Sequence, residues 1–259
     1  MQGWPFAKRP TIFTGEMLIE ICADSVEGAL AAQRGGADRI ELCGSLGEGG
    51  VTPSAGLIKS VRERIDIGLQ VMIRPRGGDF LYTPAELAVL REDIRIAKDL
   101  GADGIVFGCL TAAGDIDLEQ MGSLIPLARP CGVTFHRAFD MCRDPRKALE
   151  DLVGLGVDRL LTSGQAAGCV TGMALLGELQ RQSKGRIVVM PGGGVTPQNV
   201  LEIVTATGVG EIHLSARSMR ESGMLHRNPR CSMGADGAEE YQWKTTDEAV
   251  VRAVVEQFH

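Results

Sequence analysis

The stretch Gly36-Ala37-Asp38-Arg39-Ile40-Glu41-Leu42 contains a phrase that recurs along the chain and decides its fold. The phrase is a glycine, a small or aliphatic residue and an aspartate, followed at once by an aliphatic run. It recurs at 101–103 and 156–158, and a weaker copy ending in glycine stands at 208–210. Each copy follows a helix-like segment, where a glycine in the left-handed region can end the helix and turn the chain into a strand. The copies are 65, 55 and 52 residues apart, which suits one strand–helix–strand–helix unit each.

Further short aliphatic runs lie between these copies and bring the number of expected strands to eight. Helical patterns fill the gaps, and such a repeat predicts an α/β fold, a single-domain (β/α)8 TIM barrel. The rival, an open doubly wound sheet, would usually carry Gly-x-Gly-x-x-Gly after its first strand, where this chain reads Ala23-Asp24-Ser25-Val26. The expected strands are 18–23, 39–42, 69–74, 104–107, 133–138, 159–162, 186–190 and 211–214, and the expected helices include 27–33, 84–100, 118–127, 145–155 and 199–206.

Composition narrows the class of protein. The chain has 259 residues, 44% of them hydrophobic, and a formal charge of −6, so it has no basic surplus for nucleic-acid binding. No apolar run is long enough to span a membrane, which takes about 18 residues or more. We expect residues 1–16 to form a disordered leader and residues 17–259 to form the barrel. A long loop at 218–246 would follow strand eight and overhang the barrel mouth, where its methionines could reach a bound metal.

Two of the seven cysteines lie in a repeated triplet, Glu20-Ile21-Cys22 and Glu41-Leu42-Cys43. No Cys-x-x-Cys pair occurs, so neither a zinc ribbon nor a disulfide framework is expected, and the thiols should be reduced. Residues i and i+2 of a strand share a face, so each triplet places its carboxylate and its thiol on one side. Because a structural barrel interior is mainly aliphatic, the triplets predict a functional site inside the barrel.

Cys22 and Cys43 are the candidate metal ligands. Each is the last inward residue of one of two adjacent parallel strands, so the two thiols can converge on one soft ion. Thiolates and thioethers select Cu(I), and Met72 on the next strand offers a third soft donor. The alternative is that both cysteines fill the core as small apolar residues.

Two further motifs are candidates for binding an anion. Arg74 and Arg76, held by the proline between them, can present donors to an anionic group. Gly192, Gly193 and Gly194 follow strand seven, where phosphate-binding loops of barrel enzymes often lie, and can expose backbone N–H groups before a helix at 196–197. The alternative for the glycines is an ordinary tight turn between strand and helix.

Proton transfer has three candidates in the barrel interior. His136 at the end of strand five can act as a general acid or base, although a lone histidine is more often a hydrogen-bonded structural residue. Glu20 and Glu41 are the other two. Together with His213 and the two arginines, these groups would form a charge-compensated network, because buried charges are costly unless they are paired.

The residues named so far lie in stretches that resemble the copper homeostasis protein CutC family, and the likeness extends from Leu18 to Phe258. The resemblance implies a TIM barrel that forms a homo-oligomer and binds Cu(I) through Cys22 and Cys43. It also implies a cytoplasmic location, and the nucleus is left open as a second one. Leu214 stands where relatives have a further cysteine, so strand eight is not expected to supply a thiol. The most specific stretches are GGADRIELC at 35–43, MIRPRGGDF at 72–80, TFHRAFD at 134–140, LTSG at 161–164 and MPGGG at 190–194.

The sequence thus favours a cytosolic copper homeostasis protein that binds Cu(I) through Cys22 and Cys43 at the C-terminal mouth of the barrel. The alternative is a barrel enzyme that acts on a small phosphorylated or carboxylated substrate, with its anionic group held by Arg74, Arg76 and the three glycines. The sequence does not assign a reaction, so whether the protein is an enzyme stays open.

Overall fold

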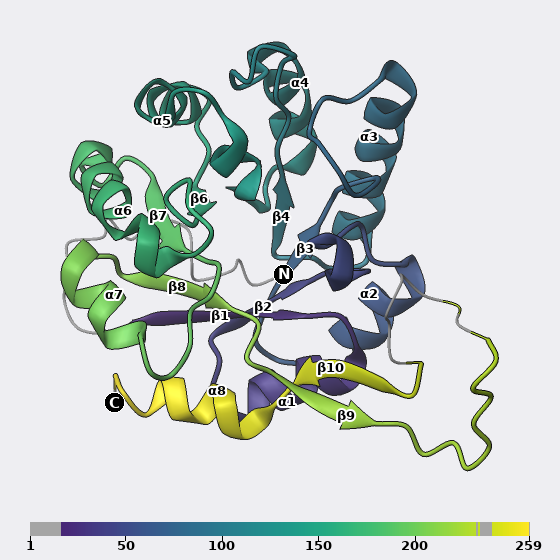
Figure 1. The fold of residues 1–259 in the computed structure, drawn as a ribbon. Coiled ribbons are helices and arrows are strands. Elements are labelled where there is room, and N and C mark those ends of the chain that lie inside the picture. The colour runs from purple at the N-terminus through teal and green to yellow at the C-terminus, as the bar shows by residue number, and fades with distance from the viewer. Residues whose placement is uncertain (1–16, 232, 234–239, 259) are drawn as a thin grey trace.

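Eight parallel strands form a barrel in which each strand pairs with its neighbours along the chain (Figure 1). The structure is a computed structural model that describes residues 17–231, 233 and 240–258, so the expected leader lies outside the described residues. The sheet runs in the order β7-β6-β5-β4-β3-β2-β1-β8, and a parallel bridge between Gly192 and His213 joins its two edges. The strands are β1 Leu18–Ala23, β2 Arg39–Leu42, β3 Gly68–Met72, β4 Gly104–Phe107, β5 Gly132–Phe135, β6 Arg159–Thr162, β7 Val188–Pro191 and β8 Glu211–Leu214.

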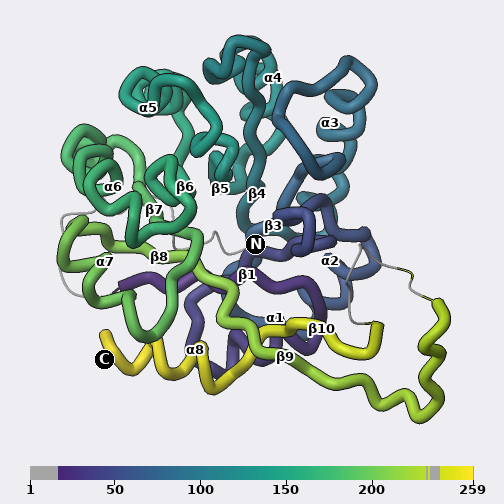
Figure 2. Tube along the Cα trace, viewed as in Figure 1, coloured from purple at the N-terminus to yellow at the C-terminus, as the bar shows by residue number. Residues whose placement is uncertain are grey.

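Helices surround the barrel, as both views of the chain show (Figures 1 and 2). Their N-terminal N–H groups are often capped by side chains: Ser25 caps α1, and Thr83 and Glu86 form a capping box at the start of α3. No helix in the described part of the chain is both long and apolar enough to cross a membrane. The helices are α1 Val26–Arg34, α2 Ala55–Arg62, α3 Pro84–Asp99, α4 Leu118–Ala128, α5 Pro145–Gly154, α6 Cys169–Ser183, α7 Val200–Thr207 and α8 Glu248–Val255, with short 3-10 helices η1 Leu46–Glu48 and η2 Arg137–Met141.

Alternation along the strands divides the core into two parts. Ile19 and Ile21 of β1 are fully buried in the aliphatic layer between strands and helices. The intervening Glu20 and Cys22 are also buried, but on the opposite face of the strand, inside the barrel. The predicted (β/α)8 barrel is therefore confirmed, and its interior carries charged and sulfur-containing side chains.

Most predicted elements shift by one or two residues at an end, as the strand expected over 186–190 does, which is Val188–Pro191, and three differences bear on the site. The strand expected over 133–138 ends at Phe135, because the His136 side chain accepts the N–H of Ala138 and starts η2. The strand expected over 69–74 ends at Met72, before the proline-containing turn. The helix expected at 196–197 begins at Val200, after a turn in which the Asn199 side chain accepts the N–H of Thr196.

The expected irregular loop at 218–246 contains two antiparallel strands, β9 Arg217–Glu221 and β10 Gln242–Thr246. The N–H of Asp247 donates to the carbonyl of Ala216, which ties the two ends of this hairpin together. The hairpin lies beside α1 (Figure 1). Met219 and Met224 are exposed to solvent. Over the described residues, no side chain of 218–246 lines the cavity at the barrel mouth, and the parts of this loop at 232 and 234–239 lie outside the described residues.

Candidate functional site

A layer of paired charges fills the lower part of the barrel interior. Arg39 on β2 donates to Glu20 on β1, and its Nη2 lies 2.6 Å from Oε2 of Glu211 on β8. Arg159 on β6 completes the layer, with its Nη2 at 3.2 Å from Oε1 of Glu211. Burial alone would raise the pKa of Glu211, but Arg159 and Arg39 outweigh it and hold this pKa at about 2. Two acids and two guanidinium groups therefore neutralise one another.

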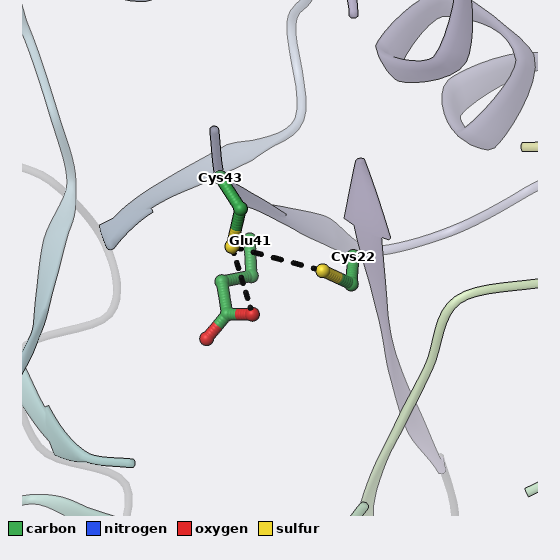
Figure 3. Close-up of side chains that lie close together, drawn as sticks. All are labelled: Cys22, Glu41 and Cys43. Carbon is green, nitrogen blue, oxygen red and sulfur yellow. Dashed lines mark hydrogen bonds between the residues drawn. The ribbon is translucent and has the colours of Figure 1, made fainter. Parts of the chain in front are cut away.

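The thiol cluster lies directly above this layer, where β1 and β2 end (Figure 3). Cys22 pairs in register with Glu41, so the Cys43 thiol, two residues further along β2, reaches across to Cys22. The two sulfur atoms are 3.7 Å apart, and Sγ of Cys43 lies 3.4 Å from Oε2 of Glu41. Met72 on β3 is buried in the same small cluster. Two thiols and a carboxyl group thus meet at one point, and the Met72 side chain packs in the same cluster.

His213 on β8 links the thiol cluster to the charge layer. It pairs in register with Glu20, whose Oε1 lies 2.8 Å from its Nδ1, while its Nε2 is 3.7 Å from Oε2 of Glu41. Burial would lower the pKa of His213, but Glu41, the Cys22 thiolate and Glu20 raise it well above the usual value. These neighbours therefore favour the cationic form of the imidazole, which lies between carboxyl groups and a thiol.

The environment makes Cys22 the acidic thiol of the pair. A hydrogen bond from Cys43 is the main cause that lowers the pKa of Cys22 to about 6, against the effect of burial and with the help of His213. The same hydrogen bond and burial raise the pKa of Cys43. Burial also raises the pKa of Glu41, which outweighs the opposing charge of His213. Cys22 is therefore the more acidic of the two thiols, and burial favours the protonated form of the Glu41 carboxyl group.

The remaining buried cysteines contrast with this pair. Burial raises the pKa of Cys109 and of Cys169 to about 12, and that of Cys142 to about 11. None of these three lines the cavity at the mouth, and all seven cysteines are free thiols. Cys109, Cys142 and Cys169 are therefore less reactive core residues than Cys22.

A cavity of about 440 Å³ opens above the thiol cluster at the C-terminal ends of the strands. Cys22, Glu41, Met72 and His213 form one part of its wall. Its size is within the range of small-molecule sites, roughly 300–1,000 Å³. The cluster is therefore buried but not sealed, and a small ion or molecule has a route to Cys22. The other part of the wall includes Arg74, Phe80, His136, Arg137, Gly193, Gly194 and Arg217.

The structure separates the two arginines proposed for anion binding. Arg74 is 5% exposed and lines the cavity. Arg76 lies outside it, with its guanidinium bonded to Glu86 at 2.6 Å and to Asp79 at 2.9 Å. The reason is that β3 ends at Met72, so the strand alternation that would place both arginines inward does not extend through Pro75. Arg76 instead fixes the turn that leads into α3.

His136 and the glycine turn after β7 also reach the cavity. Gly193 and Gly194 line it with positive φ angles of 115° and 74°, conformations that favour glycine. Gly192 closes the barrel instead, because its N–H donates to Thr162 and it bridges to His213. Of the three glycines, two therefore face the cavity.

Sequence reasoning missed the contacts of three residues in the barrel interior. His213 was placed on the inward face by alternation, but not joined to the thiols. Arg39 and Arg159 were not identified, although Arg39 is two residues before the inward Glu41 and so shares its face. The signal for Arg39 was present in the alternation, whereas the contact of Arg159 with Glu211 crosses the barrel and has no sequence signal.

The fold and the site define a (β/α)8 barrel with a buried cluster of two thiols, a carboxyl group and an imidazole at its mouth. The chain belongs to the CutC family, whose sequence model matches residues 17–218. It is 54% identical over 238 residues to the copper homeostasis protein cutC homolog of Homo sapiens, which covers 92% of this chain and 87% of the human protein. The CutC family protein of Bacteroides thetaiotaomicron is 50% identical over 238 residues, or 91% and 96% of the two chains.

A solved structure supports the same assignment. The crystal structure of the copper homeostasis protein CutC from Streptococcus agalactiae has a TM-score of 0.74 and 36% sequence identity to this chain. The match covers 77% of this chain and 98% of the streptococcal one. The predicted family is thus confirmed, and the names of its members connect the family with copper homeostasis.

Proposed function

We propose that this protein serves copper homeostasis by binding Cu(I) through Cys22 and Cys43 at the mouth of its barrel. The observation that carries the proposal is the 3.7 Å separation of the two sulfur atoms, which project toward each other from adjacent strands (Figure 3). Two thiols this close can bind one ion without movement of either strand. Soft sulfur ligands select Cu(I), and Met72 packs in the same cluster as a third soft donor.

The charges around the thiols suit a monovalent ion. Cys22 is a thiolate at neutral pH, and its negative charge is balanced by the His213 cation. Binding of Cu(I) would displace the proton of Cys43, because metal ligands must be deprotonated. The result is a dithiolate site with one net negative charge, and the imidazolium beside it offsets that charge. Glu20 supports the site by holding His213 in place at 2.8 Å.

The cavity gives the proposed ion a way in and out. Cys22, Glu41 and Met72 line it, while Cys43 is 1% exposed and lies behind them. Incoming copper would therefore meet Cys22 first and then Cys43. This arrangement suits an ion that is taken up and released, as a copper-handling protein requires.

Competition for Cu(I) against a chromophoric chelator tests the proposal. The reduced wild type should bind one equivalent, and the Cys22→Ser/Cys43→Ser variant should lose far more than the roughly 10- to 100-fold that follows loss of an outer-shell partner. Cys109→Ser is the matched control, since it removes a buried thiol that does not line the cavity. Affinity that survives in the double variant, with its thermal unfolding unchanged, would refute thiol binding.

The place of action and the assembly are part of the proposal. We place the protein in the cytoplasm, with the nucleus as a second compartment, because reducing conditions there would keep Cys22 and Cys43 as thiols. We also propose a homo-oligomer, supported by the apolar side chains that the hairpin exposes at Met219, Leu225 and Trp243. Light scattering on wild type and Leu225→Glu tests this: a monomeric wild type would contradict it.

Catalysis is a second candidate function, favoured by one observation. Cys22 is a thiolate at neutral pH, lies beside a cationic His213 and lines a cavity of small-molecule size. Such a thiolate is a competent nucleophile. The Glu41 carboxyl group next to it, whose pKa is raised by burial, could donate a proton. Burst-phase release of product with Cys22 covalently modified would support an enzyme, and the absence of any turnover with anions that bind would count against it.

A further inference from the structure

The wall of the cavity that faces the thiol cluster carries a buried arginine without an acidic partner in the described chain. The guanidinium of Arg74 is held by main-chain carbonyls: Nη1 donates to Glu48 and Gly50 at 2.9 Å each, and Nη2 donates to Gly78 at 2.7 Å. Its Nε–H is buried and forms no hydrogen bond of ordinary geometry, although the guanidinium interacts with the buried Tyr82 hydroxyl. Because a buried cation normally pairs with an anion, Arg74 leaves positive charge uncompensated in this part of the cavity.

His136 lines the same cavity and carries a second buried donor without a partner. Its Nδ1 accepts the N–H of Ala138 at 3.3 Å, so the proton of the neutral ring lies on Nε2. Nε2 is buried and lacks a partner among the described residues. Burial and the charge of Arg74 lower the pKa of His136 to about 3, so the ring stays neutral and donates through Nε2–H near pH 7.

The Phe80 ring contacts both of these donor side chains. Phe80 lies 4.9 Å from the centre of the His136 ring, and the Arg74 guanidinium lies 4.9 Å from the centre of the Phe80 ring. The turn after β7 adds main-chain donors, since the N–H groups of Gly193 and Gly194 form no hydrogen bond with other described residues. The unpartnered side-chain groups of Arg74 and His136 are therefore both donors.

We propose that this wall, formed by Arg74, His136, Gly193 and Gly194, binds the oxyanion group of a small organic ligand, a phosphate monoester or a carboxylate. The oxygens of such a group can accept hydrogen bonds from these donors, and its negative charge complements the charge of Arg74. Phe80 offers an apolar surface to the carbon part of the ligand. A cavity of about 440 Å³ also leaves room for the ligand to reach Cys22.

This inference goes beyond copper binding and does not depend on it, because no residue of the wall is a thiol. It also narrows the anion site expected from the sequence. The proposed site keeps Arg74, Gly193 and Gly194 and adds His136 as a hydrogen-bond donor. It no longer includes Arg76 and Gly192. Arg217 also lines the cavity, and its Nε is buried without a partner among the described residues. Its Nη2 lies 3.6 Å from Oδ2 of Asp24, so this arginine has an acidic neighbour.

Calorimetric titration with inorganic phosphate, glycerol 3-phosphate and lactate tests the inference. We expect at least one probe to bind the wild type and to lose tenfold or more, about 1.4 kcal/mol, in Arg74→Gln and in His136→Phe. Binding of the two phosphates alone would identify a phosphorylated ligand, and binding of lactate alone a carboxylated one. Arg76→Gln is the matched control, since it removes a nearby arginine that does not line the cavity.

Two results would overturn the inference: no probe binds the wild type, or Arg76→Gln weakens binding as much as Arg74→Gln does. Because Arg74 also holds main-chain carbonyls, circular dichroism must show that its variant is folded; His136→Phe, which keeps an aromatic ring against Phe80, provides the independent test. The Cys22→Ser/Cys43→Ser variant should keep its affinity for the probe, and Arg74→Gln should keep its affinity for Cu(I). Failure of one proposal can therefore be told from failure of the other.

Discussion

Two polar layers lie one above the other in the same barrel, and they differ in how completely their groups are paired. In the lower layer, Glu20, Arg39, Glu211 and Arg159 satisfy one another within the interior. In the upper layer, which lines the mouth, Arg74 and His136 keep buried N–H groups that form no hydrogen bond of ordinary geometry, and Oε1 of Glu41 also has no partner in the described chain. Both layers are buried and both carry charge.

The difference shows that burial of ionisable groups is not by itself evidence of function. A network that uses all its hydrogen-bonding capacity inside the protein has nothing left for a ligand, so the lower layer is a structural element. A buried donor or acceptor without a partner destabilises the ligand-free protein, and a ligand that supplies the missing hydrogen bond removes that cost. The upper layer therefore marks the site, and the thiol pair lies at the boundary between the two.

Removal of Arg39 should have the largest effect on stability. Arg39→Leu leaves Glu20 and Glu211 buried next to each other with less compensation, so we expect a loss of about 3–5 kcal/mol in the free energy of unfolding. Urea denaturation followed by circular dichroism measures it. A loss below about 1 kcal/mol, which is typical of a single ordinary hydrogen bond, would contradict the structural role of the lower layer.

Acid should lower the free energy of unfolding through Glu211 of the same layer. The pKa of Glu211 is about 2 in the folded state against an ordinary value of 4.5, so its ionised form stabilises the fold above pH 4.5. As the pH falls from 4.5 toward 2, the unfolded chain takes up the proton first, and this group alone should cost about 3 kcal/mol. Unfolding free energies at pH 5, 4 and 3 should fall in wild type and fall less steeply in Glu211→Gln. Parallel slopes would disprove the assignment.

A substitution in the upper layer should cost much less. His136→Phe removes a donor that has no partner and one hydrogen bond from Ala138, so we expect a loss of about 1 kcal/mol at pH 7. The aromatic contact with Phe80 is kept. If this variant lost as much stability as Arg39→Leu, the two layers would be equally structural and the comparison would fail.

Arg76→Gln should have the smallest effect. Arg76 is partly exposed and pairs with Glu86 and Asp79 at the surface, where ion pairs contribute little. We expect an unchanged thermal midpoint and unchanged affinity for both Cu(I) and phosphate. A clear loss of either affinity would mean that the turn after β3 shapes the cavity more than the contacts of Arg76 indicate.

Much of the fold could be predicted because its signal is local. The repeated glycine phrase ends a helix and starts a strand at 39–42, 104–107, 159–162 and 211–214, and each of these four strands has those bounds in the structure. The hairpin of β9 and β10 could not be predicted in the same way. Its strands are short and mostly exposed, so they lack the apolar alternation by which a strand is recognised.

The site was predictable only as far as strand alternation reaches. Alternation placed Glu20, Cys22, Glu41 and Cys43 on inward faces, and the structure brings them together around His213. It did not separate Arg74 from Arg76, since that difference depends on where β3 ends. Nor could it pair Arg159 with Glu211, because the stagger of strands around a closed barrel decides which side chains meet across it.

The central claim is that Cys22 and Cys43 together hold Cu(I), and copper K-edge X-ray absorption tests it most directly. The reduced protein with one equivalent of Cu(I) should show a sulfur shell from the two thiolates, with Met72 as the candidate third sulfur. The Cys22→Ser/Cys43→Ser variant should lose that shell, while Cys109→Ser should keep it. A nitrogen and oxygen shell in the wild type, or a sulfur shell that survives in the double variant, would contradict the claim.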